Sequence, residues 1–470
     1  MKWIAITLLT CFCSDLTAQN IETKLAAAIS ILEKDLQFKH AIISLYVADA
    51  KTGKMIFDKN GEVGLAPASC QKVVTSVSAF EMLGKGYRYK TMLGYDGAIK
   101  NNVLNGNLYI VGYGDPSLGS WRWKETTEKM ILNNLVKAVQ NTGIKKINGN
   151  VFGYDRIWES NNTPDGWIWQ DIGNYYGAGA SSLNWRENQY DIILEAGNNP
   201  GDKVTIDKII PKLENVGLYS EVITAKKGSG DNAYIYLPPY GISGYVRGTI
   251  PAGEKKFTIS GAMPNAAEQL TLTFVNALKE KAIEGILFSG SYNGMEVEKK
   301  DIAINPTFFF TVESPPLDSI NYWFLKKSIN LYGEALVKTI AYEKIKFGST
   351  DSGVAVIKNF WKQKGIEPAA LHIIDGSGLS PANRVTTHAL VTVMQYARQQ
   401  QQWFASFYNA LPEINGIKMK DGYINGVRSY TGYIKNKTGN EYTFSFIVNN
   451  FDGSPGTVRE KMWKVLDNLK

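Results

Sequence analysis

A serine and a lysine three residues apart, Ser69 and Lys72, are the pair whose types and spacing could do nucleophilic chemistry. Val73 and Val77 recur at helical spacing after them, so the segment predicts a helix that Ser69 opens and Gly84 ends. Residues three apart share a helix face, so the Lys72 amine can reach the Ser69 hydroxyl and serve as its base. No other serine in the chain has a lysine three residues on.

The pair alone is weak evidence for an active site, because serine and lysine occur at this spacing by accident in many proteins. Enzymes built on Ser-x-x-Lys use two further pieces, a Ser-x-Asn on a loop and a Lys-Thr-Gly on a strand. Ser-x-Asn begins at five serines, namely Ser160, Ser182, Ser291, Ser319 and Ser328. Lys-Thr-Gly begins at Lys51 and at Lys437.

Sequence context chooses among these copies. The tripeptide Ser328-Ile329-Asn330 is embedded in helical sequence of the C-terminal part, which favours it over the copy at Ser319. Lys51 lies at a predicted hairpin tip and is better explained by turn chemistry. Lys437-Thr438-Gly439 enters a predicted strand, residues 441–449, whose edge could place backbone N–H groups beside a bound acyl group. These two copies are the expected partners of the Ser-x-x-Lys pair.

Histidine and metal-binding patterns are scarce, which excludes most other hydrolytic chemistries. The chain has three histidines, no His-Glu-x-x-His and no Gly-x-Ser-x-Gly. Cysteines at metal-binding spacing are absent after the leader, where Cys70 is the one cysteine left and cannot form an internal disulfide. We therefore expect a hydrolase that uses no metal and no cofactor, with lysine as the base.

The first residues predict export. Lys2 supplies a charged start, an apolar run follows, and Leu16-Thr17-Ala18 offers a cleavage point, so residues 1–18 are interpreted as a signal peptide. A lipoprotein reading at Cys11 or Cys13 is the disfavoured alternative. The expected location is the periplasm or the cell wall.

The charge balance is moderate. A net charge of +7 would allow peripheral contact with a membrane or with an anionic wall polymer, although a mixed, solvated surface explains it as well. No Lys/Arg block typical of nucleic-acid binding occurs, so no nucleic acid is expected as a partner. Nothing in the sequence predicts the oligomeric state.

Periodicity predicts the elements that must position the pair. The sequence predicts a helix over 21–37, a hairpin over 41–47 and 54–57, strands over 428–436 and 441–449, and a closing helix over 457–469. Between the Ser69 helix and the helices that return after residue 311, the chain is rich in strands and turns. The fold class is therefore α/β (α+β).

The segments Ser69-Cys70-Gln71-Lys72, Ser328-Ile329-Asn330 and Lys437-Thr438-Gly439, in that order, resemble a low-molecular-mass penicillin-binding protein. The likeness is greatest to the D-alanyl-D-alanine carboxypeptidase/endopeptidase family called peptidase S13, or class C. Further likeness lies in residues 114–118, 174–178, 314–317 and 375–380, so it covers nearly all of the mature chain.

The resemblance implies a fold and its division into domains. The fold would be a penicillin-binding-protein/serine β-lactamase-like catalytic domain, an antiparallel sheet flanked by helices, split by inserted β-rich domains. The catalytic domain would comprise residues 19–90 and 306–470. Inserted domain II would comprise 91–187 and 251–305, and domain III would comprise 188–250.

The resemblance also implies a reaction. Ser69 would attack the D-Ala-D-Ala amide of a peptidoglycan stem peptide through an acyl-enzyme, and β-lactams would inhibit it covalently. Lys72 would be the base, Ser328 would relay a proton to the leaving amine, and Asn330 would orient Lys72. Two alternatives stay open, a serine β-lactamase or esterase of the same fold and a non-catalytic cell-wall-binding scaffold.

Substrate binding is assigned by the same resemblance to the second Lys-Thr-Gly. Lys437 and Thr438 would bind the terminal carboxylate, and Gly439 would leave room for the substrate. The backbone N–H of Asn440 would complete an oxyanion hole with that of Ser69.

Overall fold

The computed structural model describes residues 21–293 and 304–470, so the predicted signal peptide lies outside the described residues. The chain divides into two compact units. Unit 1 comprises the chain up to Met82 together with Asn321–Ser328 and Val354–Lys470, and unit 2 comprises Leu83–Ile320 and Ile329–Gly353. Over the described ranges, none of the helices combines the length and the apolar character that a membrane span requires.

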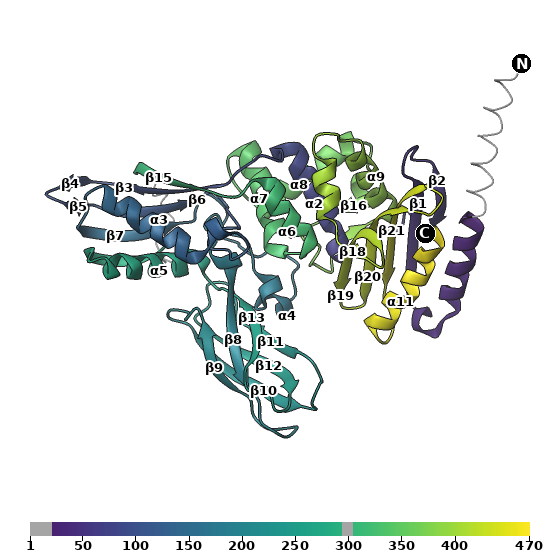
Figure 1. Ribbon diagram of the computed structural model, residues 1–470, viewed down its shortest axis with the longest axis horizontal. Helices are drawn as coiled ribbons and strands as arrows, with labels where there is room; N and C mark the ends of the chain where they lie inside the picture. The colour runs from purple at the N-terminus through teal and green to yellow at the C-terminus, as the bar shows by residue number, and fades with distance from the viewer. Residues whose placement is uncertain (1–20, 294–303) are drawn as a thin grey trace, which may run out of the picture. The chain divides into compact units, whose positions relative to one another are not determined.

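Unit 1 is built on a six-stranded sheet in the order β18-β19-β20-β21-β1-β2, with every neighbouring pair antiparallel (Figure 1). The strands are β1 (Ile42–Asp49), β2 (Met55–Lys59), β18 (Glu413–Ile414), β19 (Ile417–Ile424), β20 (Val427–Lys435) and β21 (Glu441–Asn449). The predicted hairpin and both predicted C-terminal strands are therefore confirmed. The strands β18 and β19 were not predicted.

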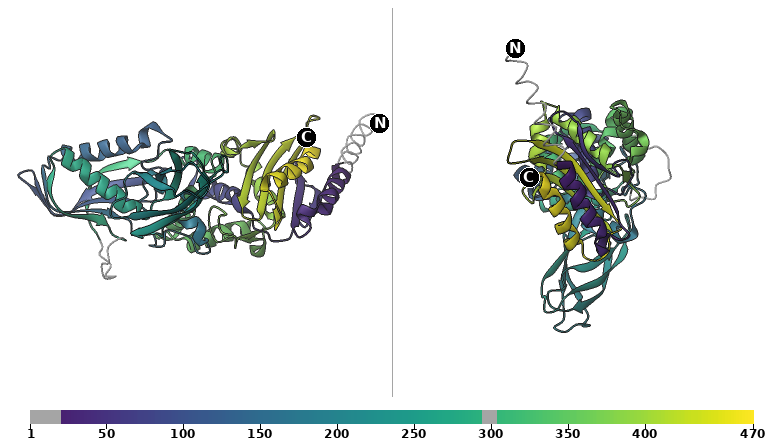
Figure 2. Two further views of the ribbon diagram at one scale, coloured as in Figure 1. Left: turned by 90° about the horizontal axis from the view of Figure 1, so that it is seen from below. Right: turned by 90° about the vertical axis from the view of Figure 1, so that its right-hand side faces the viewer.

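Helices cover both faces of this sheet. The helical residues 21–34 and α11 (Pro455–Leu466) share a hydrophobic core with one face, where Leu45 and Phe446 are buried (Figure 2). On the other face, α9 (Thr387–Arg398) is joined to the sheet, since the Tyr433 hydroxyl donates to the Met394 carbonyl over 2.6 Å. The expected antiparallel sheet flanked by helices is thus confirmed.

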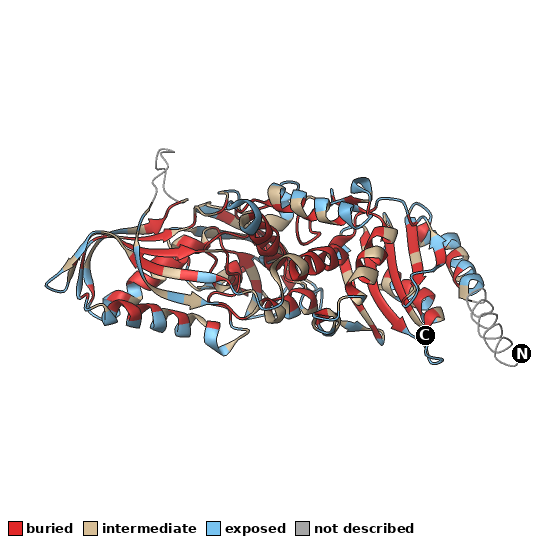
Figure 3. Cartoon of the chain, turned by 90° about the horizontal axis from the view of Figure 1, so that it is seen from above, coloured by how far each residue is buried: buried red, intermediate tan, exposed pale blue. Residues whose placement is uncertain are grey.

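The helix after Ser69 is buried along almost its whole length. A 3₁₀ turn, η2 (Ala68–Gln71), leads directly into α2 (Lys72–Leu83), in which every residue from Lys72 to Phe80 is buried. A helix with no solvent-facing side lies in the centre of its domain, and Figure 3 shows the buried class concentrated in the helices and strands of the interior. The prediction that Ser69 opens the helix is off by one turn, because Ser69 lies in the 3₁₀ turn.

The remaining helical elements lie in the C-terminal half or at the chain ends. They are η1 (Leu36–Phe38), α6 (Leu317–Lys326), α7 (Asn330–Ile345), α8 (Thr350–Gln363), η6 (Pro368–Ala370), α10 (Phe404–Ala410) and η7 (Asp467–Leu469). A small ribbon, β16 (Leu371–His372) with β17 (Arg384–Val385), closes the loop between α8 and α9.

Unit 2 is rich in strands, as predicted. Its largest sheet has seven strands, in the order β15-β3-β6-β7-β5-β4 with β14 beside β7, and two smaller sheets have the orders β13-β8-β9 and β10-β12-β11. The strands are β3 (Lys90–Tyr95), β4 (Ala98–Lys100), β5 (Val103–Asn105), β6 (Leu108–Gly112), β7 (Lys146–Tyr154), β8 (Gln189–Glu195), β9 (Thr205–Ile210), β10 (Gly217–Ala225), β11 (Asn232–Tyr236), β12 (Ser243–Pro251), β13 (Phe257–Ala262), β14 (Glu284–Ser291) and β15 (Thr307–Glu313). Besides α7, its helical elements are η3 (Lys124–Thr126), α3 (Glu128–Asn141), α4 (Trp169–Ile172), η4 (Tyr175–Gly177), η5 (Arg186–Asn188) and α5 (Ala266–Glu280). The expected borders of domains II and III stay a prediction, because the division found here has two units only.

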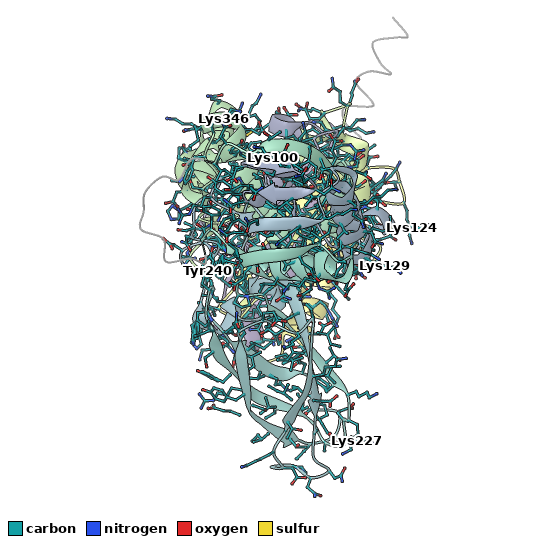
Figure 4. The ribbon with its side chains drawn as sticks, turned by 90° about the vertical axis from the view of Figure 1, so that its left-hand side faces the viewer. Lys100, Lys124, Lys129, Lys227, Tyr240 and Lys346 are labelled. Atoms are coloured by element: carbon teal, nitrogen blue, oxygen red, sulfur yellow. The ribbon has the colours of Figure 1, made fainter. Side chains whose placement is uncertain are left out.

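Exposed lysines are scattered over unit 2. Figure 4 labels Lys100 on β4, Lys124 on η3, Lys129 on α3 and Lys227 after β10, and all four are exposed. They come from separate elements and form no single basic block.

Candidate active site

Ser69 and Lys72 meet as the sequence predicts. The Lys72 side chain is fully buried, and its Nζ lies 2.9 Å from the Ser69 Oγ. The same amine donates to the backbone carbonyl of Ser377 over 2.8 Å. Ala68, which precedes the serine, has a φ of 45°, a costly value for alanine and of a kind that gathers at functional sites. The pair is thus held in the geometry of a nucleophile beside its base.

A turn over residues 375–380 holds the lysine from the other side. The buried Asp375 carboxylate accepts from the backbone N–H groups of Gly378 and Ser380, each over 2.8 Å, and from the Gln71 amide over 2.8 Å. These bonds fix the turn against η2, so the Ser377 carbonyl faces Lys72. Gly378 has a φ of +80°, and a Cβ there would lie 2.0 Å from the Ala68 oxygen. Only glycine fits that position.

Strand β19 lies directly against the nucleophile. A Cβ built on Gly422 would lie 2.8 Å from both the Pro67 oxygen and the Ser69 nitrogen. The Cys70 thiol donates to the Lys420 carbonyl over 3.2 Å, so the turn and the strand are joined on both sides of Ser69. The tripeptide beside the serine is therefore Lys420-Asp421-Gly422.

Lys437-Thr438-Gly439 lies elsewhere, which corrects the sequence assignment. Residues 436–440 form the exposed turn between β20 and β21, where the Asn440 N–H donates to the Asn436 side chain over 2.8 Å. Ser429, six residues before the end of β20, is the residue of that strand that contacts Pro67. At about 3.3 Å per residue, the turn lies roughly 20 Å beyond that contact. Lys437, Thr438, Gly439 and Asn440 therefore do not bind substrate beside Ser69, and Asn440 does not complete its oxyanion hole.

A hairpin signal could have found the correct tripeptide. Asn425-Gly426 is the two-residue loop that joins β19 to β20, since Ile424 pairs with Val427. Asn-Gly is among the strongest short hairpin signals. Lys437-Thr438-Gly439 matches the motif in all three residues. The tripeptide before Asn425 has aspartate where the motif has threonine, so a search for the motif does not find it.

One edge of β19 is open next to the serine. Strand β18 pairs only with Ile417 and Lys418, and within the described ranges no strand covers that edge from Lys420 to Ile424. An open edge offers backbone N–H and C=O groups to an extended ligand. The backbone around Gly422, together with the Ser69 N–H, is the part of unit 1 that could hold an acyl oxygen.

Lys420 and Asp421 form a charge pair at this edge. The Lys420 side chain is 1% exposed, and its Nζ lies 3.1 Å from the Asp421 Oδ1 and 2.6 Å from the Asp421 carbonyl oxygen. Burial alone would raise the pKa of Asp421, but Lys420 and then Arg428 outweigh it and lower that pKa overall. Asp421 is therefore ionised at neutral pH.

The Ser-x-Asn tripeptide falls at the boundary between the units. Ser328 belongs to unit 1 and has a φ of 57°, whereas Asn330 begins α7 in unit 2 and donates to the Tyr176 carbonyl over 2.7 Å. Their roles beside Ser69 stay predictions. At the competing copy, Asn321 accepts from Ser76 on α2 over 2.7 Å, which is a packing contact inside unit 1.

Cys70 is a packing residue, as expected. It is fully buried, and burial raises the pKa of its thiol to about 11, so it is protonated at neutral pH and a poor nucleophile. In the part of the chain that the structure describes, no group of three or more His, Cys, Asp or Glu side chains could hold a metal ion.

The sheet flanked by helices, with a lysine-paired serine at the start of a buried helix, defines a penicillin-binding-protein or serine β-lactamase-like fold. The family model for the D-Ala-D-Ala carboxypeptidase 3 (S13) family matches residues 25–418. The chain therefore belongs to this family of serine-type peptidases.

Individual relatives agree over most of their length. The chain is 24% identical over 427 residues to D-alanyl-D-alanine carboxypeptidase DacB of Haemophilus influenzae, covering 87% of this chain and 85% of the relative. It is 26% identical over 468 residues to D-alanyl-D-alanine carboxypeptidase of an Actinomadura species, covering 92% and 82%. The crystal structure of H. influenzae penicillin-binding protein 4 matches with a TM-score of 0.75 at 23% identity, covering 88% of this chain and 91% of that one. A second structure of that protein, complexed with a novel β-lactam, has a TM-score of 0.72 at 23% identity, with coverage of 92% and 96%.

Proposed function

We propose that the chain is an exported peptidase that cleaves peptidoglycan stem peptides after D-alanine through a Ser69 acyl-enzyme and is acylated by β-lactams. The observation that carries this proposal is the buried Lys72 amine, 2.9 Å from the Ser69 hydroxyl and fixed by the Ser377 carbonyl. Family membership supports the substrate class, and the relative complexed with a β-lactam supports the inhibitor.

The reaction begins when Lys72, in its neutral form, takes the Ser69 proton as the oxygen attacks the carbonyl carbon of D-alanine. The developing oxyanion accepts hydrogen bonds from the Ser69 N–H and from the backbone at Gly422. Ser328 relays the proton to the departing amine while the amide C–N bond breaks, and Asn330 orients the lysine. Water then hydrolyses the ester and restores Ser69.

The first prediction concerns the nucleophile. Ser69→Ala removes the attacking oxygen, so it abolishes both hydrolysis and covalent labelling by a fluorescent penicillin. Lys72→Ala keeps the oxygen but lacks the base, and lowers the acylation rate by about 10²-fold or more. Stopped-flow labelling measures both, and an unchanged circular dichroism spectrum shows that each variant is folded. Labelling of the Ser69→Ala protein would refute the assignment.

A serine β-lactamase of the same fold would use the same three segments but would release the acyl group quickly. The lifetime of the penicilloyl adduct distinguishes the two enzymes, since a peptidase keeps the label for many turnover times.

Digestion of intact muropeptides then shows whether free D-alanine or opened cross-links are the product. Membrane or wall contact is tested by fractionating cells that produce the full chain.

A further inference from the structure

An exposed tryptophan of unit 2, Trp121, is fixed in place by its two neighbours in the chain. It is 52% exposed, whereas the Glu187 side chain beneath it is fully buried. The Ser120 hydroxyl donates to the Glu187 carboxylate over 2.7 Å, and Arg122 donates to both of its oxygens over 2.6 Å and 3.0 Å. A two-point bond of this kind adds geometric definition as well as energy. The chain is therefore anchored on both sides of Trp121, and the indole is held at the surface.

The indole borders a cleft of unit 2. The cleft has a volume of about 570 Å³, within the range of roughly 300–1,000 Å³ that small-molecule sites occupy. Its walls come from the Trp121 segment, from α3 and from the end of α5. The Arg122 guanidinium lies over the Trp121 ring, 5.7 Å from its centre, so the ring is supported by a cation on one face. A rigid aromatic surface thus stands at the edge of a hollow large enough for a ligand.

The charges that line the cleft are balanced. Glu128 and Glu280 are acidic, and Lys129, which Figure 4 labels, and Arg186 are basic. Arg186 and Glu128 also form an ion pair with each other. A polyanion such as a phosphate polymer binds where positive charge is in excess, and this lining has no excess of either sign. The cleft therefore suits a neutral ligand.

The uncharged groups of the lining indicate which neutral ligand fits. The Asn133 amide can both donate and accept, which matches a hydroxyl group. Leu132 and Ala277 add apolar surface on which a methyl group can pack. The C–H bonds on one face of a sugar ring carry a partial positive charge and stack on the negative face of an indole. An N-acetylated amino sugar combines all of these features, namely a C–H face, hydroxyls, an acetamido methyl and no net charge.

We propose that this cleft binds neutral chains of N-acetylated amino sugars, with Trp121 as the surface on which a sugar ring stacks. The inference goes beyond the proposed function, because it assigns unit 2 a binding site for the sugar part of a wall polymer. It requires no chemistry at Ser69, since no bond is formed or broken in the cleft.

The test is calorimetric titration of the protein with chitotetraose, the tetramer of N-acetylglucosamine. All proteins carry Ser69→Ala, so that reaction at Ser69 does not contribute heat. We expect saturable binding that Trp121→Ala weakens by about tenfold or more. Asn133→Ala should weaken it by about threefold or more, because one hydrogen-bonding side chain is lost. Asn133 is exposed on α3, so this second variant keeps the test informative if Trp121→Ala disturbs the fold.

Trp169→Ala is the matched control. Trp169 is another exposed tryptophan of unit 2, on α4, and is not among the residues that line the cleft. Its loss should change the affinity for chitotetraose by less than about twofold. Absence of chitotetraose binding, an unchanged affinity in both cleft variants, or tighter binding of a glycerol-phosphate polymer would overturn the inference. Failure of the unmodified protein to label with penicillin would instead refute the proposed function, and the sugar titration would still decide this inference.

Discussion

At the scale of single residues, the contacts of Lys72 explain why its amine can serve Ser69. The Ser377 carbonyl is a neutral acceptor, so it orients the amine without adding a negative charge to hold its proton. The Asp375 side chain accepts from the Gln71 amide and from backbone N–H groups of its own turn. The turn thus holds the Ser377 carbonyl against the Lys72 amine while Asp375 fixes the turn to η2.

Lysine variants distinguish the two candidate tripeptides. Lys420→Ala removes a buried lysine beside the nucleophile and leaves Asp421 with Arg428 as the one other cation that lowers its pKa, so we expect penicillin acylation to slow by about 10-fold to 100-fold. Lys437→Ala removes an exposed side chain from a distant turn and should change acylation by less than about twofold. Second-order acylation rates measure both. Equal losses in the two variants would contradict the placement of the site on β19.

Site residues could be predicted from the sequence where they lie close together in the chain. The Ser69 and Lys72 pair needed only helical geometry over three positions, and that prediction is confirmed by the 2.9 Å contact. The lysine of β19 was not found, because a pattern match cannot tell a strand from a hairpin turn. The Asn425-Gly426 hairpin signal marks that strand locally, but its contact with Pro67 joins segments more than 300 residues apart and is not a local property.

At the scale of elements, α7 is held by a buried lysine. Lys338 is fully buried, and its Nζ lies 2.6 Å from the Asn161 carbonyl, 3.1 Å from the Ala180 carbonyl and 3.1 Å from the Glu159 carboxylate. Burial lowers the pKa of Lys338, and Glu159 opposes that shift. The helix that begins with Asn330 is therefore tied to the loops of unit 2.

Lys338→Met keeps the length of the side chain but removes its charge and donors. Three acceptors then lose the lysine donor, although Glu159 keeps the Thr350 N–H, so the free energy of unfolding should fall by about 3–5 kcal/mol. Urea titration followed by circular dichroism measures it. Lys344→Met, at an exposed position of the same helix, is the control and should cost less than about 1 kcal/mol. Similar losses in both variants would show that the buried contacts contribute little.

Elements with regular periodicity were predicted well. The strands β20 and β21 and the closing helix α11 appear within two residues of the predicted starts. β19 was missed because Lys418, Lys420 and Asp421 give it a polar composition. Burial does not explain that composition, because Lys420 is buried; its pairing with Asp421 satisfies the charge instead.

At the scale of the whole molecule, buried carboxyl groups couple stability to pH. Asp115 in unit 2 is 2% exposed, and its Oδ1 accepts from the Ser117 N–H and hydroxyl over 2.8 Å and 2.6 Å. Burial raises the pKa of Asp115 to about 6, although the Ser117 bonds oppose that shift. The folded chain therefore binds this proton more tightly than the unfolded chain does.

The direction in which stability changes with pH follows from this difference in the pKa of Asp115 between the folded and the unfolded chain. Because the folded pKa exceeds the ordinary value of about 3.9, stability is lost as the pH rises from about 4 to about 6. Asp115→Asn does not titrate, so it should lose up to about 3 kcal/mol less than the unmodified chain over that interval. Thermal unfolding at a series of pH values measures both curves. The exposed variant Asp165→Asn should follow the unmodified curve, and parallel curves for all three proteins would contradict the assignment.

The central pairing of the unit 1 sheet joins the two ends of the described chain, since Ile42 on β1 lies opposite Asn449 on β21. Strand β19, which contacts the nucleophile, is also made late in synthesis. Contacts between such distant segments form slowly, and a growing chain cannot form them at all until its last part has emerged. A ribosome that stalls before residue 417 therefore releases a polypeptide whose serine, although already made, is inert. Completion of the sheet therefore comes before any reactivity of Ser69.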